Sequence, residues 1–128
     1  MNEVTAKLNS YRQSPRKVRL VASAIRGKSV LEAKNRLTLI TKRAVSPLHK
    51  LLNSAVANAK NLGMDEKVLK VKAITVDGGQ ILYRRMPVSH GSAHPIRKRT
   101  SHIKITLVET VAKKEKKAVE EKTASKKK

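Results

Sequence analysis

The stretch MPVSHGSAHPIRKRTSHI, residues 86–103, decides the fold because it joins two segments that have strand patterns. It contains two prolines, one glycine and several basic residues, but no carboxylate. Its few apolar side chains bury too little surface to offset the conformational entropy that is lost when such a stretch becomes ordered. A lone hairpin is marginal in water. We therefore expect this stretch to form the far end of a β-hairpin that is either mobile or ordered by something outside the chain.

Both arms of the expected hairpin continue into segments with strand character. Before it, VLKVKAITV (68–76) is strand-like, but its apolar residues change phase between Val71 and Ile74, which predicts a β-bulge. Asp-Gly-Gly at 77–79 predicts a bend. After the stretch, apolar and polar residues alternate over 103–107, as in a half-buried strand. The two segments should pair as antiparallel strands.

Three helices are predicted nearer the N-terminus, after a short strand around residues 4–8. Ser14 and Pro15 suit the N-cap and first position of a helix that ends at Gly27. Ser29, followed three residues later by Glu32, has the spacing of a capping box. The third helix carries an apolar stripe from Leu48 to Ala59. Its start is open, because Pro47 can lie before the first turn or within it.

These patterns predict an α+β fold in which three helices pack on a small three-stranded antiparallel sheet, with two strands extended into a long β-hairpin (about residues 80–104). We expect one domain over residues 1–109. Residues 110–128 are low-complexity and Lys-rich, which is typical of a disordered, solvated tail. Leu20 lies off the apolar face of the first helix, so we expect it to pack against a strand or another helix.

The charge of the chain indicates a polyanionic partner. It has 30 Lys and Arg against 9 Asp and Glu, a net charge of +21, far beyond what solubility requires. Nucleic acid is the commonest such partner, and acidic lipid is the alternative. Only Tyr11 and Tyr83 are aromatic, so contacts should be mostly to phosphate and sugar, with some Arg stacking. Cysteine is absent, which suits a reducing cytoplasm.

Basic residues gather in two places, one at residues 12–28 and one on the expected hairpin, where no acid occurs between Asp77 and Glu109. A ribbon with cations on both arms can slide between RNA segments and meet phosphate on each face. An isolated run of charge is usually only a solvated face. With the charge of the whole chain, we favour RNA binding by Arg12, Arg16, Lys17, Arg19, Lys28, Arg84, Arg85, Arg97, Lys98, Arg99 and Lys104.

Several segments, in this order, resemble the bacterial-type L twenty-two family of large-subunit ribosomal proteins. They are SPRKVRLVASAIRGKSVLEA, LLNSAVANAKN, VDGGQILYRRMP and IRKRTSHIKITLV, and the resemblance covers about residues 3–109. It implies a structural, non-catalytic protein without a cofactor, which binds large-subunit ribosomal RNA and aids subunit assembly. The implied partners are that RNA, neighbouring large-subunit proteins and the nascent peptide, on cytoplasmic ribosomes.

The resemblance also implies where the parts of the protein lie. The globular part would lie near the opening of the peptide exit tunnel, and the hairpin tip would line the tunnel wall, where changes alter the response to macrolide antibiotics. The family usually has a strongly basic run after the methionine, whereas Val88, His90 and Ser92 stand at such positions here. Pairing with phosphate is therefore expected from the arms. The expected tip comprises Met86, Pro87, Val88, Ser89, His90, Gly91, Ser92, Ala93 and His94.

Other functions are disfavoured by what the sequence lacks. His90, His94 and His102 have no cysteine or nearby carboxylate to complete a metal site. We expect His102 to support the returning strand instead. Ser101 and His102 are neighbours on a strand and face opposite ways, so they form no catalytic dyad. A DNA reader would need a recognition helix, and a membrane-bound protein would need bulky apolar residues opposite the bases. We therefore expect no enzyme, no DNA partner and no membrane partner.

Overall fold

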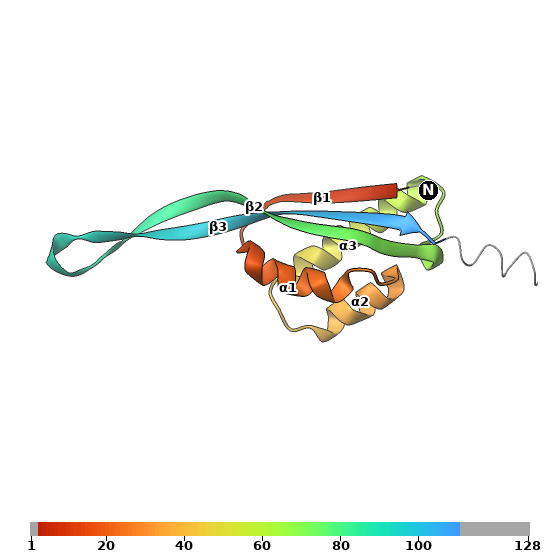
Figure 1. The fold of residues 1–128 in the computed structure, drawn as a ribbon, viewed down its shortest axis with the longest axis horizontal. Coiled ribbons are helices and arrows are strands. Elements are labelled where there is room, and N and C mark those ends of the chain that lie inside the picture. The colour runs from red at the N-terminus through yellow and green to blue at the C-terminus, as the bar shows by residue number, and fades with distance from the viewer. Residues whose placement is uncertain (1–2, 111–128) are drawn as a thin grey trace, which may run out of the picture.

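The computed structural model describes residues 3–110 as three helices on one face of a three-stranded antiparallel sheet, which confirms the α+β fold (Figure 1). The Lys-rich tail expected at 110–128 lies, from residue 111, outside the described residues. The strands are β1 (Glu3–Tyr11), β2 (Leu69–Pro87) and β3 (Ala93–Glu109). The helices are α1 (Pro15–Ile25), α2 (Val30–Leu39) and α3 (Val45–Asn61), and two single turns are η1 (Glu66–Val68) and η2 (Ser89–Gly91).

The core lies between the helices and one face of the sheet. β3 runs between β1 and β2, and its alternate residues Ile103, Ile105 and Leu107 are fully buried. Val4 and Ala6 of β1 face the same side, because Val4 pairs with Leu107 and Ala6 with Ile105. Each helix adds the apolar stripe that its period predicts. The buried helical residues are Val18, Val21, Ala22, Ile25, Val30, Ala33, Leu37, Leu48, Leu51, Leu52, Ala55, Val56 and Ala59.

The helix ends follow the sequence signals with two adjustments. Ser14 is the N-cap of α1, but its side chain makes no capping hydrogen bond. Its backbone carbonyl accepts hydrogen bonds from the N–H groups of Lys17 and Val18. Ser29 accepts a hydrogen bond from the backbone N–H of Glu32, whereas the Glu32 carboxylate contacts Lys28 and Arg36 instead of closing the capping box. Pro47 lies within the first turn of α3, which settles the position of that start.

The bulge in β2 occurs where the apolar phase changes. The register with β3 shifts between Val71 and Ala73, and this shift brings Ile74 and Val76 to the same buried face as Val71. The bend expected at 77–79 does not interrupt the strand. β2 continues to Pro87 through a second register shift, between Gly78 and Ile81. The two glycines therefore produce a bulge within the strand, and they do not end it.

Beyond the helices, β2 and β3 continue as a long two-stranded hairpin (Figure 1). It is paired from Ile81 opposite Arg99 to Pro87 opposite Ala93, and no residue from 80 to 99 is buried. Gly91 has a φ of +70°, as a turn glycine should, but His90 also has a positive φ of +58°. The hairpin thus has regular pairing without a hydrophobic layer.

A compact polar junction joins the hairpin to the body. Thr100 is buried, and its hydroxyl donates a hydrogen bond of 2.6 Å to the carbonyl of Gln80. His102 accepts a hydrogen bond at Nδ1 from the backbone N–H of Ser10, at 3.1 Å, so it supports the returning strand as expected. Gly79 packs against both side chains: a Cβ there would lie 2.5 Å from Thr100 Oγ1 and 2.9 Å from His102 Nε2.

We predict that Gly79→Ala destabilises the protein by about 1–3 kcal/mol, because the added methyl group displaces two side chains that brace the hairpin. The matched control is Gly78→Ala, since a Cβ at Gly78 meets nothing within 4 Å. Urea denaturation followed by circular dichroism compares the two variants. Equal stability of the two variants would show that the junction is not tightly packed.

At the other end of β2, the Glu66 carboxylate contacts two lysines, Lys34 and, at 2.8 Å, Lys60. The hydrogen bond from Lys34, and then that from Lys60, lowers the pKa of Glu66 from 4.5 to about 2. Because the group is more acidic in the folded chain, its stabilising contribution is complete above the unfolded value. It is lost as the pH falls from 4.5 towards 2.

We predict that Glu66→Gln lowers the free energy of unfolding by about 1 kcal/mol at neutral pH, a modest effect because partly exposed pairs are screened by solvent. The difference from the parent chain should shrink below pH 4.5 and vanish near pH 2. Denaturant titrations at a series of pH values measure it, with Asp65→Asn as the control at an exposed neighbour. A difference that stays constant across that range would contradict the assignment.

Candidate nucleic-acid interface

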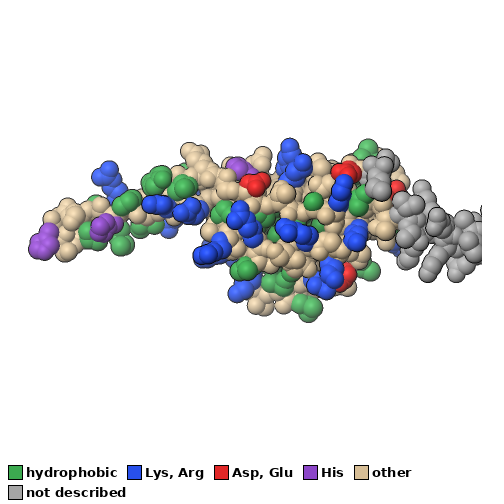
Figure 2. Space-filling view, in the orientation of Figure 1, with side chains coloured by type: hydrophobic (Ala, Val, Ile, Leu, Met, Phe, Trp, Pro, Cys, Tyr) green, Lys and Arg blue, Asp and Glu red, His purple; other side chains and the backbone are tan. Residues whose placement is uncertain are grey.

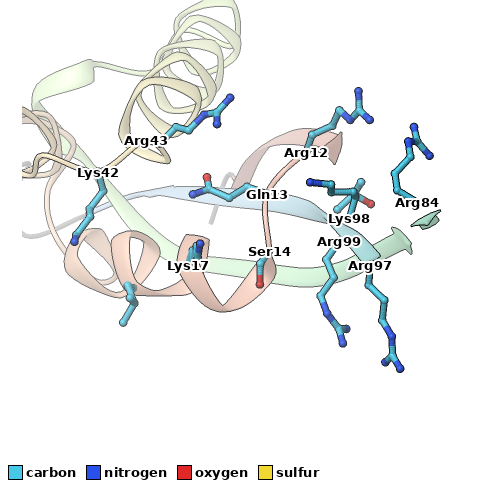
Figure 3. Close-up of a pocket in the computed structure, with 12 residues that line it drawn as sticks. Arg12, Gln13, Ser14, Lys17, Lys42, Arg43, Arg84, Arg97, Lys98 and Arg99 are labelled. Atoms are coloured by element: carbon cyan, nitrogen blue, oxygen red, sulfur yellow. The ribbon is translucent and has the colours of Figure 1, made fainter. Parts of the chain in front are cut away.

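A basic hollow of about 970 Å³ lies where the hairpin leaves the body (Figure 3). Three parts of the chain that are distant in sequence meet there: the β1–α1 connection with the first half of α1, the link between α2 and α3, and the two hairpin arms. Their positions are fixed by the start of α1 and by the pairing of β2 with β3. We define the basic hollow by its lining residues, Arg12, Gln13, Ser14, Lys17, Leu20, Lys42, Arg43, Arg84, Arg97, Lys98, Arg99 and Thr100.

The charge of the basic hollow is uncompensated. Eight of its twelve lining residues are Lys or Arg, and none is acidic. Within residues 3–110, the ion pairs of the protein involve other cations: Lys28, Lys34, Arg36, Lys60 and Lys72. Eight like charges around one open concavity repel one another and favour an anionic ligand. The arginines can bind phosphate oxygens in pairs, and the lysines can act as point charges.

The hairpin continues this basic surface on both of its faces. Alternate residues of a strand point to opposite faces, so Arg97 and Arg99 share one face while Lys98 lies on the other. Figure 3 shows Arg97 and Arg99 pointing the same way and Arg84 pointing the opposite way. Further along the body, Lys104 is exposed on the sheet face that the helices leave open. Cations therefore line the ribbon on two sides, as the sequence predicts.

The structure separates the candidate residues into groups. Arg12, Lys17, Arg84, Arg97, Lys98 and Arg99 line the basic hollow, and Arg16, Arg85 and Lys104 are exposed outside it. Lys28 lies elsewhere. It contacts Glu32 at 3.4 Å beside a second hollow, whose lining mixes lysines with the carboxylates of Glu32, Asp65 and Glu66.

Arg19 holds α1 against the sheet. Its guanidinium donates two hydrogen bonds to the carbonyl of Val76, at 3.0 Å from Nε and 2.8 Å from Nη2. Arg26 acts in the same way on the carbonyl of Ile74, at 3.1 Å. β2 is an edge strand of the sheet, so these carbonyls have no partner strand. Arg19 of α1 and Arg26 at the C-cap of α1 satisfy them.

The RNA-binding residues predicted from the sequence omit two of the eight cations of the basic hollow, and they also omit its Gln13. Lys42 and Arg43 lie in the α2–α3 link, where no helical or strand period indicates which way their side chains point. Their position just before α3 is the one sequence feature that could have suggested them. Gln13 also lines the hollow, and its Oε1 is buried without a hydrogen-bond partner within the described chain. The expectation that Leu20 packs against another element is wrong, because its side chain is 69% exposed at the edge of the hollow.

The hairpin tip carries no such concentration of charge. Within residues 86–94, all side chains are exposed except that of Val88, which is partly exposed. The tip is closed by a hydrogen bond from the N–H of Val88 to the carbonyl of Ser92, at 2.9 Å. Over residues 3–110, no three His, Cys, Asp or Glu side chains are grouped so that they could hold a metal ion. In the same range, no helix is long and apolar enough to cross a membrane.

Comparison with known proteins gives the family. The model of the family described as "Ribosomal protein L22p/L17e" matches residues 6–108, which include the whole basic hollow and hairpin. The chain belongs to this L22p/L17e family. The resemblance found in the sequence motifs is thereby confirmed.

Individual relatives agree with the L22p/L17e assignment, and each is named large ribosomal subunit protein uL22. The chain is 50% identical over 106 residues to the protein of Pelobacter propionicus, covering 82% of this chain and 96% of the relative. Identity is 52% to that of Mycoplasma mycoides, with the same coverage. It is 53% to that of Mesoplasma florum, covering 82% and 95%.

We predict that Arg19→Met lowers the free energy of unfolding by about 1–2 kcal/mol, because the Val76 carbonyl loses its charged donor. Arg16→Met is the matched control: it removes the same charge from an exposed position on the same helix. Thermal and denaturant unfolding of the two variants measure the difference. If both variants are equally stable, the contact of Arg19 with β2 does not contribute to the stability of the fold.

Proposed function

We propose that this L22p/L17e protein is a structural constituent of the large ribosomal subunit that binds large-subunit ribosomal RNA and aids assembly of the subunit. Its relatives are named as large-subunit proteins, and the match covers 95–96% of the length of each. It acts by binding and has no enzymatic role. Its place is the cytoplasmic ribosome, in contact with that RNA and with neighbouring large-subunit proteins.

The observation that carries this proposal is the basic hollow, where eight cations converge and no carboxylate is present. Phosphate groups are the ligands that such a surface neutralises, and release of their counterions drives binding. RNA fits better than DNA. The main basic element is a two-stranded ribbon with cations on both faces, whereas Arg19 of α1 and Arg26 at its C-cap bind carbonyls of β2.

The hairpin has the properties of an element that RNA orders. No side chain from 80 to 99 is buried, so the ribbon has no core of its own, and phosphate on either face would hold its arms. The tip is different, because His90, Gly91 and Ser92 offer little fixed charge. We assign the arms to ribosomal RNA. We assign the tip to the wall of the peptide exit tunnel, beside the nascent peptide, with the globular part near the tunnel opening.

We predict that Lys42→Gln with Arg43→Gln weakens binding to a large-subunit ribosomal RNA transcript and lowers its salt dependence. The slope of log K against log salt should fall by about 0.7–0.9 for each phosphate that the variant no longer neutralises. Filter binding over a range of potassium chloride concentrations measures both effects. The two residues lie in a link between helices, so the body should fold unchanged, which circular dichroism checks.

The control for this prediction removes the same charge elsewhere. Lys67→Gln with Lys70→Gln lies at the second hollow, among Asp65 and Glu66. It should leave the salt slope unchanged. If the two double variants reduce the slope equally, binding depends only on net charge, and the basic hollow is not the RNA site. Failure of the parent chain to bind the transcript, or to sediment with the large subunit, would refute the proposed function.

A further inference from the structure

Tyr83 is exposed on a charged hairpin arm, outside the hydrophobic core. Its side chain is 58% exposed, and it is one of only two aromatic residues in the chain. The other, Tyr11, is partly buried and packs against the hydrophobic core. The two rings therefore have different roles. Tyr11 contributes to packing, whereas Tyr83 presents its ring to whatever the hairpin meets.

Arginine side chains surround Tyr83 on its own face of the ribbon. Tyr83 pairs with Arg97 across the two strands, and residues directly opposite in an antiparallel pair point to the same face. Arg85 and Arg99 share this face, because each lies two residues along its strand from one member of that pair. This face continues the helix-covered side of the sheet, because Arg97 and Arg99 lie an even number of residues before the buried Ile103 on β3 and so point to the same side. It therefore opens towards the basic hollow.

The opposite face has no tyrosine. There, Leu82 pairs with Lys98, Arg84 with Ile96, and Met86 with His94. Arg84 also donates a hydrogen bond of 2.7 Å to the carbonyl of Tyr83, which fixes the backbone at the base of the ring. The two faces thus differ in chemistry. One places the phenol ring of Tyr83 beside guanidinium groups, and the other has cations without a tyrosine beside them.

We propose that Tyr83 and Arg97 form a stacking platform for one unpaired base of the RNA. This inference rests on the proposed function and adds the kind of RNA that the arm recognises. A ring and a guanidinium plane both stack on a nucleobase, while Arg85 and Arg99 bind the phosphates beside it. Bases within an A-form helix are stacked on one another and present no free face. The platform therefore selects a splayed-out base in a loop, bulge or single strand.

The experiment compares two RNA probes that differ only in whether their bases are free. One is a single strand of about 12 nucleotides and mixed sequence, within the range that such surfaces cover. The other is the same strand paired with its complement. Tyr83→Leu in the full chain should weaken binding to the single strand about tenfold, the scale expected when one base no longer stacks, and leave duplex binding unchanged.

Two controls make the result specific to stacking. Tyr83→Phe keeps the ring and should bind the single strand like the parent chain. Lys98→Gln removes a charge from the opposite face, where Lys98 pairs with Leu82, and should weaken both probes alike. A direct readout uses a Tyr11→Phe background, in which Tyr83 is the only tyrosine and no tryptophan is present. Its fluorescence should be quenched by the single strand and much less by the duplex.

The outcomes separate the stacking platform from the proposed function. If the parent chain binds both probes but Tyr83→Leu weakens neither, or weakens both equally, the platform is refuted while phosphate binding stands. A loss for Tyr83→Phe as large as for Tyr83→Leu would also refute it, because the hydroxyl would then be the contact. If the parent chain binds neither probe, both proposals fail.

Discussion

Beyond the helices, β2 and β3 hold each other mainly through backbone hydrogen bonds, because neither arm has a buried hydrophobic layer. Nothing from residue 80 to 99 is buried, whereas the same two strands are the centre of the core nearer their other ends. Ladder hydrogen bonds contribute about 1 kcal/mol each, which is too little to offset the entropy of ordering the residues that make them. The shape of the hairpin therefore depends on its root and on what surrounds it.

The root explains why the hairpin leaves the body in a defined direction. The register of β1 shifts opposite residues 101–103 of β3, and the register of β2 shifts opposite the adjacent residues 99–101. Thr100 and His102 of the central strand fill the space between them and bond to the backbone on each side. The junction replaces the hydrophobic core with hydrogen bonds at the point where the core ends. It also sets the arms beside the start of α1, which forms the basic hollow.

Periodic features can be predicted from the sequence, and contacts between unrelated segments cannot. The apolar phase change between Val71 and Ile74 predicts a bulge, because a buried face leaves a strand no other way to keep both sets of side chains inside. Lys42 and Arg43 have no period, and their role depends on where the α2–α3 link passes. The prediction for Leu20 is wrong because an apolar side chain at an interface site need not be covered in the free protein. The positive φ of His90 also has no sequence signature.

The distribution of acids separates the part of the molecule that folds from the part that binds. The ion pairs of residues 3–110 use Glu3, Glu32 and Glu66, and all of them lie on the body. In Figure 2 the acidic side chains likewise appear on the body, and none appears along the hairpin. Acids on the arms would neutralise the arginines intramolecularly, and an RNA would then have to displace them. Because the cations of the arms have no carboxylate partners, the hairpin is less stable in the free protein. Each of these cations nevertheless stays available to phosphate. The self-repulsion that the chain tolerates when free is relieved on binding, which adds a driving force that shape complementarity alone would not supply.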